Sequence, residues 1–192
     1  MTLRRHRAES ARNLGLGLVL LTGLYSPVQA KEGTQTPERT LAIGVLAHDR
    51  GPLSDHHENG VDLNLEAQFA PLGIFGSPRP HLGVTANFGG ETSVAYAGFS
   101  FRFRDTPRWF TEGFLGAAVH NGPLHKDPVR CAQFSDCGFG TRFLPRFGLE
   151  LGYRVNPAVS ISLLFDHMSH KWIVEGENEG LDHIGLRYIR AY

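Results

Sequence analysis

The strongest constraint on the fold is a strict alternation of apolar and polar residues, clearest over residues 61–69. Successive side chains of a β-strand point to opposite faces, so this stretch predicts a strand with one apolar and one polar face. Its apolar face carries Val61, Leu63, Leu65, Ala67 and Phe69, and its polar face carries Asp62, Asn64, Glu66 and Gln68. Similar stretches recur along the chain between turn residues, without helical periodicity. We expect strands over residues 41–48, 61–69, 81–88, 93–103, 109–119, 142–153, 160–169 and 181–192.

Eight amphipathic strands admit two kinds of barrel. In a soluble periplasmic lipid-binding barrel the apolar faces line a ligand cavity, whereas in an outer-membrane barrel they meet lipid and the polar faces fill the interior. Strands of about 9–11 residues are long enough to cross a membrane. Residues 188–192 end the chain on an aromatic strand, and most of the loops alternate between short and long. We therefore predict an all-β fold, an eight-stranded antiparallel transmembrane β-barrel.

The N-terminal 30 residues are typical of a secretory signal peptide. A basic region with Arg4 and Arg5 precedes the apolar run 14–24, and a small-residue cleavage site ends at Ala30. We expect a signal peptide over residues 1–30, a flexible segment over 31–39 and the barrel over 40–192. The destination is then the bacterial outer membrane.

Charge and cysteine content narrow the function classes. Removing residues 1–30 takes four arginines and one glutamate from the 19 basic and 19 acidic residues, which leaves 15 and 18. This mild acidity gives no reason to expect a nucleic-acid partner. Cys131 and Cys137 fall in one loop of an exported chain, which predicts a local disulfide. The histidines form no strong ligand spacing such as HExxH, so we expect neither a metal nor a cofactor.

The last two strands bring three chemically reactive residues together. His167 and Ser169 lie two residues apart on the apolar face of the strand 160–169. Asp182 lies on the apolar face of the strand 181–192, at the end next to the connecting loop. Because the end of one antiparallel strand lies beside the start of the next, the three side chains should meet. A nucleophile, a base and an orienting acid within reach are the requirements of serine hydrolysis.

This region resembles the lipid A 3-O-deacylases of the PagL type. The resemblance rests on His-x-Ser in the penultimate strand, on the loop end Asn-x-Gly-Leu-Asp over residues 178–182, and on the GLRY strand that follows. It implies an outer-membrane barrel that hydrolyses an ester-linked 3-hydroxyacyl chain of lipid A, with His167, Ser169 and Asp182 as its catalytic residues. The family usually has asparagine after the serine, credited with oxyanion stabilisation, and this chain has His170. The carboxylate, often a glutamate, is here an aspartate.

The resulting hypothesis is a lipid A esterase whose site lies at the outer rim and faces the outer leaflet. Lipopolysaccharide is the expected partner, and the sequence leaves a homodimer open. In the predicted mechanism Ser169 attacks the ester, His167 transfers the proton and Asp182 orients the imidazole, while His170 or a backbone N–H stabilises the oxyanion. The alternative from a different class is a structural or adhesive barrel without catalysis.

Overall fold

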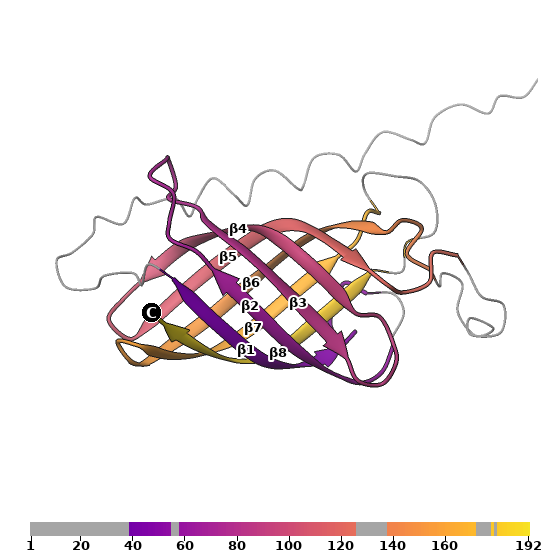
Figure 1. Cartoon of the computed structure of the whole chain (residues 1–192), viewed down its shortest axis with the longest axis horizontal. Coiled ribbons are helices and arrows are strands. Elements are labelled where there is room, and N and C mark those ends of the chain that lie inside the picture. Colours follow the sequence, from indigo (N-terminus) through magenta and orange to yellow (C-terminus); the bar gives the residue numbers. More distant parts are fainter. Residues whose placement is uncertain (1–38, 55–57, 126–137, 172–177, 179) are drawn as a thin grey trace, which may run out of the picture.

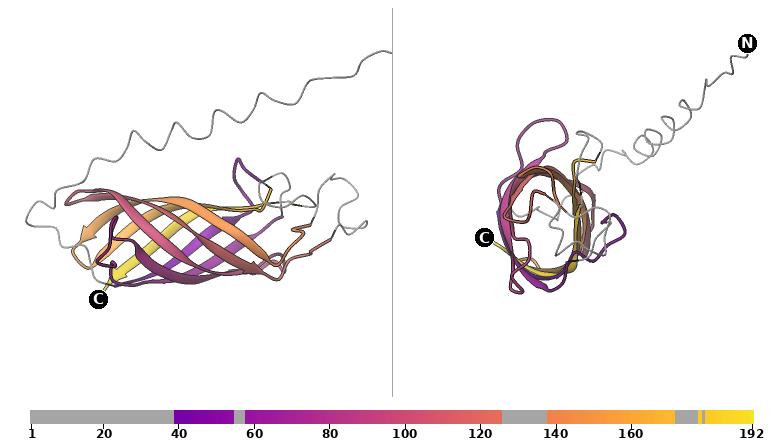
Figure 2. Two further views of the ribbon diagram at one scale, coloured as in Figure 1. Left: turned by 90° about the horizontal axis from the view of Figure 1, so that it is seen from above. Right: turned by 90° about the vertical axis from the view of Figure 1, so that its right-hand side faces the viewer.

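Eight antiparallel strands close into one barrel in the computed structural model of this chain, which describes residues 39–54, 58–125, 138–171, 178 and 180–192. Each strand pairs with its neighbours in chain order, and the last strand returns to pair with the first. Figure 1 shows the strands tilted against the long axis, and the end-on view in Figure 2 shows the ribbon closing on itself. The predicted fold class is confirmed. The strands are β1 (Thr40–His48), β2 (Val61–Gln68), β3 (Arg79–Asn87), β4 (Val94–Asp105), β5 (Trp109–His120), β6 (Phe143–Asn156), β7 (Val159–Met168) and β8 (Leu181–Ala191).

The strand boundaries differ from those predicted by a few residues at most. β7 ends at Met168 rather than at Ser169, although the backbone N–H of Ser169 still donates to the carbonyl of Pro145 over 3.2 Å. None of the residues that the structure describes belongs to a helix long and apolar enough to cross a membrane. The signal peptide over 1–30, nearly all of the lead-in over 31–39, and both Cys131 and Cys137 lie outside the described residues, so those expectations stay predictions.

The barrel presents its apolar residues outward. In β1 the burial alternates residue by residue, with Leu41, Ile43 and Val45 about half exposed, and the same alternation runs through most of the other strands. This arrangement suits a barrel whose outer surface meets hydrocarbon. It rejects the soluble alternative, in which the apolar faces would line an inner cavity.

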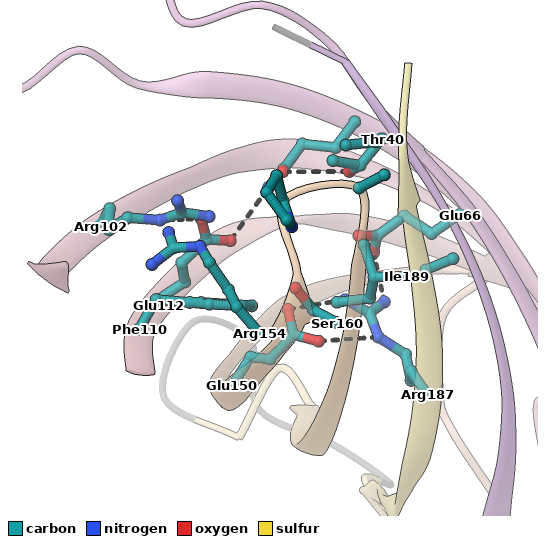
Figure 3. A pocket seen from close by; sticks show the side chains of 15 residues that line it. Thr40, Glu66, Arg102, Phe110, Glu112, Glu150, Arg154, Ser160, Arg187 and Ile189 are labelled. Carbon is teal, nitrogen blue, oxygen red and sulfur yellow. Dashed lines mark hydrogen bonds and ion pairs between the residues drawn. The ribbon is translucent and has the colours of Figure 1, made fainter. Parts of the chain in front are cut away.

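Buried ion pairs fill much of the barrel interior. Arg187 contacts Glu150 at 2.7 Å and Glu66 at 3.1 Å, and Arg102 contacts Glu112 at 2.5 Å (Figure 3). Each charge is offset by an opposite charge within hydrogen-bonding distance, which reduces the cost of desolvation. Nearer the other end, Arg146 contacts Asp166 at 2.7 Å. Asp166 thus points inward, on the face of β7 opposite to that of its neighbour His167.

The two ends of the barrel differ in their connections. The β4–β5 turn spans only residues 106–108 and the β6–β7 turn only 157–158, whereas the connections at the other end are mostly longer. Short periplasmic turns and long external loops are typical of outer-membrane barrels. The connection 69–78 is an exception at the short-turn end, where it extends beyond the barrel (Figure 1). His48 and Asp182 both lie at the long-loop end of the barrel.

Candidate active site

A histidine and an aspartate face each other across β7 and β8. His167 is the direct partner of Asp182 in the antiparallel register, which places both side chains on the same, outward face of the wall. His167 Nδ1 lies 2.5 Å from Asp182 Oδ1. The His167 side chain is 7% exposed and that of Asp182 is fully buried, although this face of the barrel is otherwise exposed. The contact fixes the ring orientation and favours the tautomer that carries its proton on Nδ1.

The second ring nitrogen of His167 meets the hydroxyl of Ser169. His167 Nε2 lies 2.7 Å from Ser169 Oγ, so with a proton on Nδ1 it accepts the hydroxyl hydrogen. Ser169 is half-buried and follows directly after the end of β7. The period of the strand places His167 and Ser169 on one face, and the ladder bond from Ser169 N–H to Pro145 keeps that period one residue beyond the strand. The structure thus brings together the three residues that the sequence predicted to meet.

The loop between β1 and β2 holds the other oxygen of Asp182. The backbone N–H groups of Leu53 and Ser54 donate to Asp182 Oδ2 over 2.8 and 3.0 Å. The backbone N–H of Asp182 itself donates to Asp49 Oδ1 over 3.4 Å. Charge-assisted bonds of this kind hold a carboxylate more firmly than neutral hydrogen bonds do. The orientation of Asp182 therefore depends on the start of this loop as much as on β8.

Gly51 allows the loop to pass this close to the carboxylate. A Cβ at position 51 would lie 2.6 Å from Asp182 Cβ, a separation that side chains do not tolerate. The sequence analysis missed Gly51, Leu53 and Ser54, because their role depends on closure of the barrel. Since β1 pairs with β8 and His48 stands opposite His183, residue 49 arrives beside residue 182. Barrel closure was the signal from which this contact could have been predicted.

Two buried acids stabilise the same loop. Burial raises the pKa of Asp49, although its Oδ2 accepts the backbone N–H of Glu58 over 2.8 Å. Burial also acts to raise the pKa of Glu58, but hydrogen bonds with His48 and from Thr92 outweigh it and leave that pKa lowered. The two carboxyl groups thus fix both ends of the loop that contacts Asp182.

His170 is directed away from the Ser169 hydroxyl by two contacts. Its Nε2 donates to the backbone carbonyl of Phe139 over 2.7 Å, and its backbone N–H donates to Asn178 Oδ1 over 2.7 Å. The side chain is buried, and Nδ1 has no hydrogen-bond partner among the described residues. Nδ1 is then an acceptor in the neutral ring, whereas an oxyanion needs a donor. These contacts tie the chain after Ser169 to the segment that precedes β6.

Apolar side chains surround the serine and histidine on the outer wall. The ring of Phe147, which is paired with His167 across β6 and β7, lies 5.2 Å from the imidazole. Phe165 and Leu163 follow along the same face of β7, and Leu163 is 46% exposed. An acyl chain lying against this face would contact these apolar side chains next to the serine. On the opposite, inner face, His48, Asp62 and His183 are the described residues close enough to share a metal ion.

Comparison with known proteins identifies the family to which this sequence is similar. The family model for lipid A 3-O-deacylase (PagL) matches residues 60–190, well over half of the chain. No curated protein matches the sequence significantly.

Three solved structures align with most of this chain. The crystal structure of the outer membrane enzyme PagL aligns with a TM-score of 0.52 and 16% identity, covering 80% of this chain and 99% of that one. A de novo designed transmembrane β-barrel aligns with a TM-score of 0.48 and 17% identity, covering 82% and 99%. Ail of Yersinia pestis, determined in a nanodisc, aligns with a TM-score of 0.45 and 14% identity, covering 80% and 99%. By its sequence match, and with a barrel of the same architecture, the chain belongs to the lipid A 3-O-deacylase (PagL) family of outer-membrane proteins.

Proposed function

We propose that this protein is a serine esterase of the outer membrane that removes an ester-linked 3-hydroxyacyl chain from lipid A. Membership of the lipid A 3-O-deacylase family supports the substrate class and the reaction. The observation that carries the serine mechanism is the continuous contact from Asp182 through His167 to Ser169, with distances of 2.5 and 2.7 Å. A hydroxyl, an imidazole and a carboxylate in this order are sufficient to generate a serine nucleophile.

The proposed reaction has two steps. Ser169 Oγ attacks the ester carbonyl carbon while its proton moves to His167 Nε2, and the tetrahedral intermediate collapses with transfer of that proton to the departing sugar oxygen. The acyl group is then bonded to Ser169. In the second step a water molecule, deprotonated by His167, attacks the acyl carbon and releases the free 3-hydroxy acid and the serine hydroxyl. Asp182 remains ionised throughout and stabilises the imidazolium form of His167.

The position of the site supports access from the outer leaflet. His167 and Asp182 face outward at the long-loop end of the barrel, where apolar side chains of β6 and β7 continue the same surface. A lipid in the leaflet can present its acyl chain to this surface and its ester to the rim without leaving the membrane. We therefore propose that Ser169 acts on lipid A in the outer leaflet.

His170 remains the oxyanion candidate from the sequence, but its contacts favour a different use. Because Nε2 already donates to Phe139, the ring could donate to an oxyanion only from a protonated Nδ1. Support for the chain that follows Ser169 is the role that the observed hydrogen bonds favour.

Mass spectrometry of lipid A tests the proposed function directly. Lipid A from cells that produce the wild-type protein should lose the mass of one 3-hydroxyacyl chain, and lipid A from cells that produce Ser169→Ala should not. Heat-modifiable gel migration should show that both proteins are folded barrels. Unchanged lipid A with both proteins, repeated on purified lipid A in detergent, would favour the structural or adhesive alternative.

A further inference from the structure

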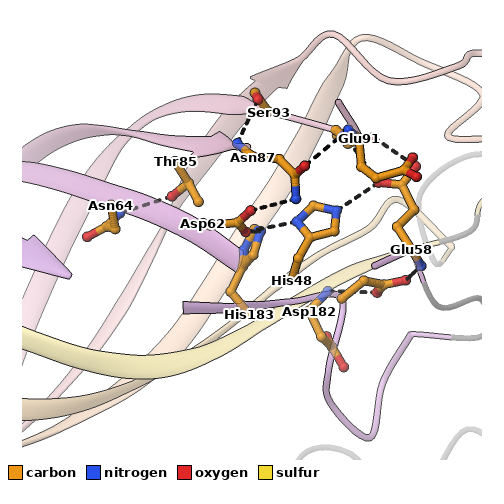
Figure 4. A network of polar contacts seen from close by, with 12 residues as sticks. His48, Glu58, Asp62, Asn64, Thr85, Asn87, Glu91, Ser93, Asp182 and His183 are labelled. Atoms are coloured by element: carbon orange, nitrogen blue, oxygen red, sulfur yellow. Dashed lines mark hydrogen bonds and ion pairs between the residues drawn. The ribbon is translucent and has the colours of Figure 1, made fainter. Parts of the chain in front are cut away.

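Two histidines converge on one carboxylate oxygen inside the barrel. His48 Nδ1 lies 2.8 Å from Asp62 Oδ2, and His183 Nε2 lies 3.1 Å from the same oxygen (Figure 4). The three residues come from β1, β2 and β8, and all three are fully buried. Their ligand atoms all lie within 4.8 Å of one another. The arrangement is unrelated to Ser169, from which the barrel wall separates it.

Two of the three distances between the candidate ligand atoms are close to those of a metal site. Ligand atoms about 2.0–2.1 Å from a tetrahedral zinc ion lie roughly 3.3 Å from one another. The two contacts to Asp62 would therefore open by a few tenths of an ångström, and the two imidazole nitrogens, which lie within 4.8 Å of each other, would adjust to the same spacing around the ion. His183 Nε2 also has no hydrogen-bond partner among the described residues, because its contact with Asp62 lacks hydrogen-bond geometry. This buried nitrogen thus faces the cluster in ion-pair contact with Asp62 but outside hydrogen-bond geometry, so a ligand bound there would replace no well-formed hydrogen bond.

The surrounding residues match what metal ligands require. Ligating histidines almost always donate their other ring N–H to a carboxylate, a carbonyl or a water, which fixes the tautomer. Here His48 Nε2 lies 2.8 Å from Glu58, and His183 Nδ1 lies 2.8 Å from Asp166. The second oxygen of Asp62 accepts the side-chain amide of Asn87 over 2.8 Å, as shown in Figure 4. Each of the three candidate ligands is therefore held by a partner on its far side.

We propose that His48, Asp62 and His183 form a binding site for a divalent transition metal ion of the Zn²⁺ type. Two imidazoles and one carboxylate are a frequent three-ligand set for zinc, with a fourth position for water. The ion would displace any protons carried by His48 Nδ1 and His183 Nε2, which limits the net charge that binding adds to the interior. The sequence did not predict this site because its ligands come from three strands and have no local spacing.

The bound ion would join β8, β1 and β2 directly behind the proposed catalytic carboxylate. His183 follows Asp182 on β8, and His48 precedes Asp49, which accepts the Asp182 N–H. The loop between β1 and β2 is connected to the same cluster through Glu58. The ion is therefore placed to stabilise the outer rim, and its binding does not depend on the proposed esterase activity.

Equilibrium dialysis of untagged, detergent-refolded protein against Zn²⁺ tests the proposal. The wild type should bind one ion per chain, and Co²⁺ should give the visible absorption of a low-symmetry site. His48→Asn should weaken binding by more than the roughly 10–100-fold typical of losing a second-shell partner, and Glu58→Gln should fall within that range. The matched control is His120→Asn, which removes a buried rim histidine on β5 and should leave affinity unchanged.

Gel migration should establish that each variant is folded before its affinity is measured. If His48→Asn does not fold, Asp62→Asn provides the same comparison with little change of volume, and the Co²⁺ spectrum of the wild type needs no variant. A wild type without Co²⁺ absorption, or one that binds no more Zn²⁺ than His48→Asn, would overturn the proposal. Equal weakening by His120→Asn would also overturn it, because binding would then be distributed over exposed or unrelated imidazoles.

Discussion

Strands β7 and β8 carry a histidine–aspartate pair on each side of the barrel wall, and the two pairs are adjacent in register. On the outer face His167 of β7 stands opposite Asp182 of β8, and on the inner face Asp166 of β7 stands opposite His183 of β8. The Nδ1-to-carboxylate distances are similar, at 2.5 and 2.8 Å. Each face therefore has an aspartate that orients a histidine, and the presence of such a pair does not by itself distinguish the two faces.

The second ring nitrogen makes the difference. His167 Nε2 meets the half-buried hydroxyl of Ser169, which can lose a proton and attack. His183 Nε2 meets the buried carboxylate of Asp62, which has no proton to give when ionised. The outer pair can thus activate a nucleophile, whereas the inner pair can only share charge or bind a cation. The chemistry of each face is determined by what the far nitrogen contacts.

Replacing the two histidines separately should give the largest difference in kcat between the outer and the inner pair. His167→Asn removes the proposed base, so kcat should fall by about 10⁴–10⁶-fold, as with the base of other serine hydrolases. His183→Asn leaves the outer contacts intact, and its kcat should stay within about tenfold, equivalent to ~1.4 kcal/mol. Release of the 3-hydroxy acid from lipid A in detergent measures both. A similar large loss in the two variants would mean that the inner pair takes part in the reaction.

Replacing the two aspartates separately should distinguish a loss of activity at the outer pair from a loss of stability at the inner pair. Asp182→Asn should lower kcat by about 10⁴-fold, because the imidazole loses its orienting charge. Asp166→Asn should leave kcat within about tenfold but cost about 3–5 kcal/mol of stability, since buried Arg146 and His183 lose their carboxylate. Thermal unfolding followed by gel migration gives the stability. The reverse assignment, a stable Asp166→Asn without activity, would contradict the distinction.

The assignment of residues to the outer or inner face follows from the alternation of side chains along each strand, so this part of the site could be predicted from the sequence. A period of two residues places His167, Ser169 and Asp182 on the apolar face from the sequence alone, and the same period places Asp166 inside. The strand boundaries also followed from alternation to within a few residues.

The remaining contacts depend on barrel closure, which local pattern does not specify. Asp62 reaches His48 and His183 only after β1 has paired with both β2 and β8. Likewise, Leu53 and Ser54 donate to Asp182 because the loop between β1 and β2 folds back over β8. No periodicity in the loop encodes that path, so the support of the proposed acid could not be predicted from the residues near it in sequence.

Gly51→Ala tests whether the loop orients the outer aspartate, a form of support that the inner pair lacks. The added Cβ would crowd Asp182 and force the loop away, so that the carboxylate loses the N–H donors of Leu53 and Ser54. A hydrogen bond to a charged group contributes about 1.5–3 kcal/mol. Because water can replace part of the two lost bonds, we expect a net loss equal to about one of them, so that kcat falls by about 10–100-fold. Gly73→Ala is the matched control, because a Cβ there meets nothing within 4 Å. Equal activity in the two variants would show that β8 alone positions Asp182.

His170→Ala should have the smallest effect, and it separates support of the outer site from chemistry within it. If the ring stabilised the oxyanion, its loss would lower kcat by about 10²–10³-fold. Because Nε2 donates to Phe139, we expect a loss in kcat below about tenfold, with a loss of stability of about 1 kcal/mol. His170→Asn provides the comparison, since asparagine is the residue that the family usually has here. A large kcat loss in His170→Ala that His170→Asn restores would assign oxyanion stabilisation to this position, and a small loss in both would assign it to backbone N–H groups.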